Sequence, residues 1–81
     1  MQSKAILKLE LRDLEAALGR LQLEQRQVIL LVGLEGMLYV EVAAILNVPV
    51  GTVRSRLSRG RDQLRQLMGM EEERAKRRRA A

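Results

Sequence analysis

The sequence has no cysteine, no histidine, no tryptophan and no phenylalanine, and Tyr39 is its only aromatic residue. Without cysteine and histidine, the chain lacks disulfides, thiolate or imidazole metal sites, and catalysis by a thiol or an imidazole. No group of carboxylates converges on one helical face, so we expect neither an enzyme nor a protein with a metal or another cofactor. The hydrophobic core has to be built from Leu, Val, Ile, Met and Ala side chains.

Long apolar runs are also missing. The most apolar stretch, residues 28–32, is far too short to cross a bilayer, and residues 1–9 lack the apolar centre of a signal peptide. The sequence therefore predicts a cytoplasmic protein without a membrane partner. Its 81 residues allow one small domain. We expect that domain over residues 1–70 and a charged tail over residues 71–81, which either continues as helix or frays.

Positive charge is concentrated near the C-terminus. The formal net charge is +5, yet residues 1–49 hold five basic and six acidic side chains, whereas residues 50–81 hold ten basic and four acidic ones. Five of those ten cations are arginines within residues 54–65. A solvated helix face explains such a cluster as readily as a surface that meets phosphates, so its position in the fold has to decide.

Apolar residues recur at helical spacing, which predicts an all-α bundle of four to five helices. In the first helix the repeat consists of Leu7, Leu11, Leu14 and Leu18. Gly36 is expected to end the second helix and Gly69 the last one, while Pro49 forces a turn before the last helix begins. The expected helices cover, in chain order, residues 4–18, 23–34, 39–46 and 50–68.

A short helix, a tight turn and a longer arginine-rich helix describe a helix-turn-helix. On a helical wheel of the last helix, one side is apolar and the opposite side begins with small polar residues edged by arginines. Serine can bond phosphates or base edges, and arginine can bind guanine with two hydrogen bonds. Ordinary exposed faces favour Glu, Lys and Gln instead, so this face favours DNA binding. The outward residues are Gly51, Ser55, Ser58 and Asp62, flanked by Thr52 and Arg59 on one side and by Arg54 and Arg65 on the other.

This segment, together with Gln25, Arg26, Glu35 and Gly36, closely resembles the fourth conserved region of bacterial sigma factors. The extracytoplasmic-function (ECF) group is the nearest match. The resemblance covers about residues 11–68, and the string PVGTVRSR that begins at Pro49 is its most specific part. It implies a domain that recognises the upstream (minus-thirty-five) promoter element and directs RNA polymerase to initiate transcription. The implied partners are double-stranded promoter DNA, the flap of the polymerase β subunit and, as in many members of this family, an anti-sigma factor.

The resemblance also implies a set of site residues. Direct DNA contacts are implied for Arg54, Ser55, Ser58 and Arg59, contacts nearer the phosphates for Thr52 and Arg56, and a backbone contact for Tyr39. The wheel independently turns Ser55, Ser58 and Arg59 outward, and we expect Arg59 to read a base directly. The first two helices carry more apolar surface than a domain of this size easily hides, so we expect partner binding by Leu11, Leu14, Leu18, Val28, Leu31 and Val32.

Four residues depart from the family pattern, and one of them is Gln22, which replaces a common proline before the second helix. Leu38 stands where a serine or threonine usually caps the third helix, a loss of about 1 kcal/mol. Val40 replaces a polar residue, so Leu38 and Val40 are expected to form an exposed apolar patch that another chain covers. Gly60, inside the last helix, costs roughly 1 kcal/mol against alanine.

Other interpretations remain open at the level of the sequence. Full sigma factors melt the promoter with a further domain rich in aromatic residues, so we expect this chain to be an excised domain or a free-standing relative. A dimeric helix-turn-helix regulator on palindromic half-sites is the main alternative. A third interpretation is an interaction module whose basic tail, Arg74 and residues 76–79, rests on acidic lipid or RNA. That interpretation leaves the small polar face of the last helix unexplained.

Overall fold

A computed structural model of the chain describes residues 4–80, with side chains from residue 11 onward. Every regular element in this part of the chain is a helix, which confirms the expected all-α fold. Residues 1–3, Ala81 and the side chain of Leu7 lie outside the described part. The elements are α1 (Lys4–Gly19), α2 (Leu23–Ile29), the π-helix η1 (Leu30–Leu34), α3 (Tyr39–Leu46) and α4 (Val50–Ala80).

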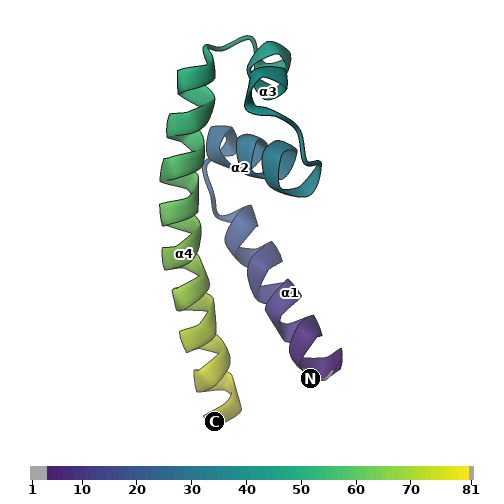
Figure 1. Cartoon of the computed structure of the whole chain (residues 1–81). Helices are drawn as coiled ribbons and strands as arrows, with labels where there is room; N and C mark the ends of the chain where they lie inside the picture. The colour runs from purple at the N-terminus through teal and green to yellow at the C-terminus, as the bar shows by residue number, and fades with distance from the viewer. Residues whose placement is uncertain (1–3, 81) are drawn as a thin grey trace.

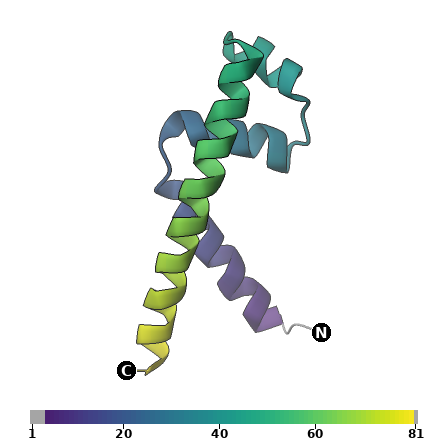
Figure 2. The same cartoon turned by 60° about the vertical axis from the view of Figure 1, so that its left-hand side comes forward.

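Helix α4 runs the length of the molecule and contacts each of the other three α-helices (Figure 1). Helix α3 packs at its N-terminal end, α2 crosses its N-terminal half, and α1 runs beside its C-terminal half. Both views show α1 and α4 diverging toward the chain termini, which lie at the same end of the molecule (Figure 2). The described chain is accordingly elongated, with extents of 48 × 23 × 16 Å.

The second helix ends as the glycine pattern predicts. Its last turn widens into η1, where the Glu35 amide donates to the Leu30 carbonyl five residues back at 3.0 Å. Gly36 then takes the left-handed conformation, with φ of 68°. This lets the Met37 amide donate to the Leu31 carbonyl at 3.0 Å, so two carbonyls at the helix end are satisfied.

Helix α3 has the bounds that the sequence predicts, and its two ends are capped differently. Leu38 offers no acceptor at the N-terminus, but its own amide donates to Glu41 Oε1 at 2.8 Å, so half of a capping box is present. Asn47 ends the helix in the left-handed conformation with φ of 56°, which asparagine tolerates better than most residues. The turn over residues 47–49 is confirmed, and α4 begins at Val50.

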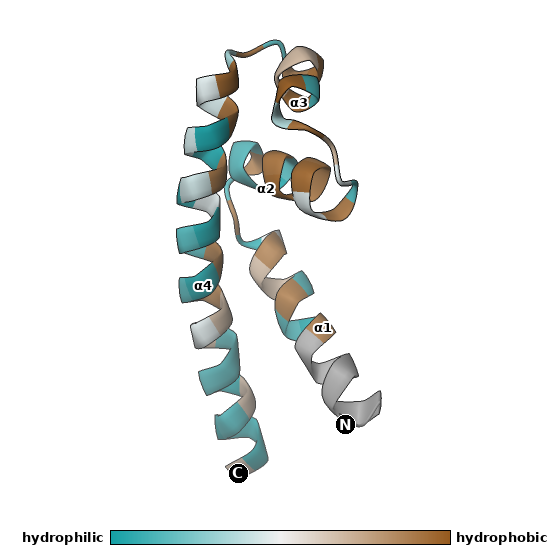
Figure 3. Cartoon of the chain, in the orientation of Figure 1, coloured by the Kyte–Doolittle hydropathy of each residue, from teal (hydrophilic) through white to brown (hydrophobic). Residues whose placement is uncertain are grey.

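The core consists of two clusters that share α4. Val28, Val42, Ala43, Val53 and Leu57 join α2, α3 and the start of α4, whereas Ala17, Leu21 and Leu67 join α1 to the middle of α4. Figure 3 shows the corresponding apolar side of α4 turned toward the other helices and its polar side turned away. The packing at both clusters fixes which face of α4 points outward.

Gly60 lies where α2 crosses α4, and it is buried. A Cβ atom on this glycine would lie 2.8 Å from Ile29 Cδ1 and 3.2 Å from Gln25 Cβ. The cost of a glycine inside a helix is therefore offset by the close approach of α2.

The expected end of the last helix is wrong. Helix α4 does not stop at Gly69 but continues to Ala80, because its C-terminal half packs against α1: Leu67, Glu71 and Ala75 are all buried. A glycine ends a helix only where the chain can turn away, and here continued packing stabilises the helix. The division of the chain at residue 70 stays a prediction, and the helix passes through that point.

Candidate nucleic-acid interface

Helix α3, the turn and the first turns of α4 form a helix-turn-helix. Val42 and Ala43 of α3 pack against Val53 and Leu57 of α4, so the opposite side of α4 faces solvent. Pro49 precedes the first helical residue, and its carbonyl accepts hydrogen bonds from the Thr52 and Val53 amides at 3.0 and 3.4 Å. Because the helix starts within this rigid turn, its first outward side chains are held in fixed directions.

The expected DNA-contacting residues gather at the N-terminal end of α4. Gly51, Arg54, Ser55, Ser58 and Arg59 are exposed there, and Thr52 and Arg56 are half-buried at the edges of the same face. Tyr39, at the start of α3, lines the same surface notch as Arg54 and Ser58. The structure thus brings Tyr39, Arg54 and Ser58 to one side of the helix and places Thr52, Arg56 and Arg59 around the other side by the helical repeat. Their DNA contacts stay predictions.

The notch contains Arg61 and Arg65, which are not among the predicted DNA contacts. It has a volume of about 390 Å³ and lies between the start of α3 and the outer side of α4. Arg61 and Arg65 line it with Asp62, and the Asp62 carboxylate accepts a hydrogen bond from the Arg65 guanidinium. The spacing of Arg54, Ser58, Arg61 and Arg65, at intervals of four, three and four, would have shown this stripe in the sequence.

The predicted partner-binding residues do not all reach the surface. Val28 is 0% exposed in the core, so it offers no surface to a partner and its assignment is wrong. Leu11 is 58% exposed on α1. Leu14, Leu18, Leu31 and Val32 are half-buried, so each presents part of its side chain. Partner binding by these five residues stays a prediction.

The apolar patch expected around the start of α3 is exposed. Leu38 and Val40 are 64% and 63% exposed, and Leu34 and Ile45 are exposed nearby in the sequence. That another chain covers this patch stays a prediction.

Comparison with known protein families decides between the interpretations of this helix-turn-helix. A model of the family described as "Sigma-70, region 4" matches residues 11–64, which include α2, η1, α3, the turn and the N-terminal half of α4. The chain belongs to the sigma-70 region 4 family.

Relatives of this region 4 domain carry names of the same group. The chain is 53% identical over 53 residues to the ECF RNA polymerase sigma factor SigE of Mycolicibacterium smegmatis, an alignment that covers 65% of this chain and 21% of the relative. It is 42% identical over 60 residues to the ECF sigma factor EcfG of Rhodopseudomonas palustris, covering 74% and 33%. It is 39% identical over 62 residues to SigW of Bacillus subtilis, covering 75% and 33%. The chain thus spans between a fifth and a third of the length of these relatives.

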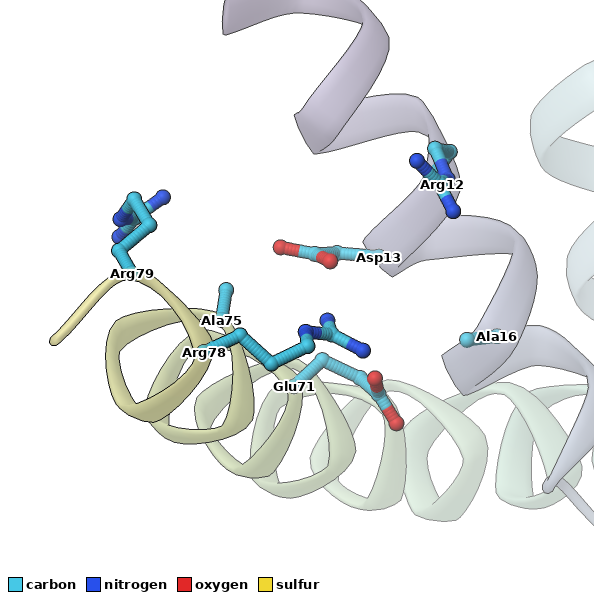
Figure 4. A pocket seen from close by; sticks show the side chains of 7 residues that line it. All are labelled: Arg12, Asp13, Ala16, Glu71, Ala75, Arg78 and Arg79. Atoms are coloured by element: carbon cyan, nitrogen blue, oxygen red, sulfur yellow. The ribbon is translucent and has the colours of Figure 1, made fainter. Parts of the chain in front are cut away.

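A second hollow lies at the other end of this region 4 domain. It has a volume of about 420 Å³ between α1 and the C-terminal half of α4, where the two helices diverge. Figure 4 shows Asp13 of α1 and Glu71 of α4 between the two ribbons, with alanines on both sides. The lining residues are Arg12, Asp13, Ala16, Glu71, Ala75, Arg78 and Arg79.

Glu71 is the one buried charged residue among the described side chains. It is 6% exposed, and its Oε1 atom lies 3.5 Å from Arg20 Nη1 and 3.5 Å from Arg74 Nη1. Two cations therefore compensate a carboxylate that would otherwise be costly to bury. Because Arg20 follows α1, this cluster also ties α1 to α4.

No helix in the described range is long and apolar enough to cross a membrane. Within the same range, no cluster of acidic side chains has the arrangement of a metal site.

Proposed function

We propose that this region 4 domain recognises the upstream, minus-thirty-five element of a promoter and thereby directs RNA polymerase to start transcription there. The observation that carries the proposal is the outward face of α4 at its N-terminus, where exposed Gly51, Ser55 and Ser58 are edged by Arg54 and Arg59. Small residues let the helix backbone approach the base edges, and the arginines supply donors for guanine and phosphate. The role is one of binding, not of catalysis, and it is exercised in the cytoplasm.

The proposal predicts a selective and salt-sensitive DNA binder. Selection from a library of random-sequence duplexes should enrich one motif. Fluorescence anisotropy on the selected duplex should then show affinity falling at least about tenfold between low and physiological salt, because roughly five arginine contacts release counterions. No enriched motif, together with an affinity that ignores salt, would contradict DNA recognition. An enriched palindrome of two half-sites, with a dimeric protein in solution, would favour the dimeric regulator instead.

The polymerase partner is proposed to bind the apolar side chains of α1 and of the α2–η1 segment. Leu11, Leu14, Leu18, Leu31 and Val32 present apolar surface there, and an amphipathic helix is the usual occupant of such a surface. We propose the flap of the polymerase β subunit as this helix, and an anti-sigma factor as its competitor.

Titrating a peptide of the flap tip into isotope-labelled domain tests this assignment by nuclear magnetic resonance. The methyl resonances of Leu11, Leu14, Leu18, Leu31 and Val32 should shift, whereas the methyls of buried Val53 and Val42 should shift much less. Shifts confined to the arginines and lysine of residues 74–79 would contradict the assignment, because a purely electrostatic contact would then explain the binding.

A further inference from the structure

The notch beside the recognition face carries a row of cations that continues the DNA-facing surface along α4. Arg54, Ser58, Arg61 and Arg65 fall within about 60° of one another on the helix, because they are spaced by four, three and four residues. All four line the notch, with Tyr39 of α3 on its other wall. Three of them are guanidiniums, and Asp62 is the only acidic side chain in the lining.

The length of this row decides which part of a duplex it can meet. Arg54 and Arg65 are eleven residues apart, which is about 16 Å along the helix axis. A recognition helix contacts base edges with its N-terminal residues. When the N-terminal turns of α4 face the base edges, the later part of the row therefore lies farther from the bases and nearer the phosphates.

The Asp62–Arg65 ion pair is compatible with a contact between Arg65 and a phosphate. The pair is solvent-exposed, with side-chain exposures of 64% and 77%, so it contributes little to stability. It does limit the directions that the long Arg65 side chain takes. Four of the five donor hydrogens of a guanidinium remain for another acceptor after one bond to a carboxylate.

We propose that the notch between Tyr39 and α4 is a seat for a phosphate of the DNA backbone, bound by Arg61 and Arg65. The inference rests on the proposed function and adds two residues to the contacts expected from the family resemblance. A backbone phosphate is favoured over an acidic protein segment because the row is continuous with Arg54 and Ser58, which face the duplex in the same binding mode.

Arg61→Gln and Arg65→Gln are the test variants, and Arg77→Gln is the matched control on the same helix. Arg77 is exposed, lies outside both hollows and stands twelve residues beyond Arg65. Each test variant should weaken binding to the selected duplex and to a scrambled duplex by a similar factor of about five, and should lower the salt slope by about 0.9. The control should bind both duplexes like the parent protein.

Neutralising single phosphates of the selected duplex as methylphosphonates locates the seat. At one position the neutral linkage should weaken binding of the parent protein by about fivefold. The same linkage should leave binding of the Arg65→Gln variant nearly unchanged, because that variant has already lost the contact. If the losses in affinity from the neutral linkage and from Arg65→Gln were additive at every position, the phosphate seat would be refuted. A further outcome would also contradict the phosphate seat. If 10 mM inorganic phosphate at constant ionic strength displaced the duplex from the parent protein but not from Arg65→Gln, the notch would be a site for free anions.

The outcomes keep this inference apart from the proposed function. A parent protein that selects no motif contradicts promoter recognition itself. A parent protein that selects a motif, with Arg61→Gln and Arg65→Gln variants that bind with unchanged affinity and salt slope, overturns the phosphate seat alone.

Discussion

Replacing Arg59 with alanine is expected to weaken binding to the selected duplex by about 1–3 kcal/mol and binding to a scrambled duplex much less. Arg59 is exposed one turn beyond Ser55, on the face that the packing of Val53 and Leu57 turns outward. From there its guanidinium can reach the acceptors on a guanine edge, which a scrambled site does not present in the same place. Anisotropy titrations of both duplexes at one salt concentration measure the difference.

Arg56→Ala is the matched comparison. Arg56 is half-buried at the edge of the same face, so we expect its side chain to contact a phosphate. The Arg56→Ala substitution should therefore weaken binding to both duplexes by similar factors and lower the salt slope by about one. Circular dichroism should show both variants folded, because neither side chain is part of the core. Equal losses on the two duplexes for Arg59→Ala would assign this arginine to phosphate and not to a base.

Replacing Gly60 with leucine is expected to destabilise the domain by about 3 kcal/mol. The first atom of a new side chain would already lie 2.8 Å from Ile29 Cδ1, so α2 would have to move off α4 and disturb both core clusters. For a chain of this size the whole free energy of unfolding is only roughly 4–12 kcal/mol. Urea denaturation followed by circular dichroism measures the loss.

The same substitution at Gly69 provides the control. Gly69 is exposed in the same helix, and nothing lies within 4 Å of a Cβ placed there. Leucine should therefore stabilise the domain by about 0.5–1 kcal/mol through helix propensity alone. If Gly60→Leu and Gly69→Leu had the same urea midpoint, close packing of α2 at Gly60 would be refuted.

The features that were predictable from the sequence are those fixed by local chemistry. Gly36, Asn47 and Pro49 each restrict the backbone at one point, and they set the bounds of α3 and of the turn. The apolar repeat of α4 determines its outward face, so the sequence alone places Ser55, Ser58 and Arg59 correctly on the surface.

The features that escaped prediction depend on contacts between distant parts of the chain. Gly69 carries the local signature of a helix end, but the packing of α4 beside α1, with Leu67 against Ala17 and Leu21, overrides it. Val28 has the same apolar character as its neighbours Leu31 and Val32, and it is buried completely where α2 packs against α3 and α4. By helix propensity alone Gly60 is a local defect, and only the close approach of Ile29 from α2 explains it.

Because α4 is long and continuous, a small rotation about one of its ends gives a large displacement of the other end. Thirty-one residues give a rod about 45 Å long; α1 packs beside its C-terminal half, and in the proposed function its N-terminal end meets the duplex. Tilting such a rod by ten degrees about its C-terminal end moves its N-terminal end by about 8 Å, more than two base-pair steps of about 3.4 Å. In the proposed function, a partner that binds beside α1 and tilts the domain would therefore move the DNA-binding end of α4 by more than two base pairs.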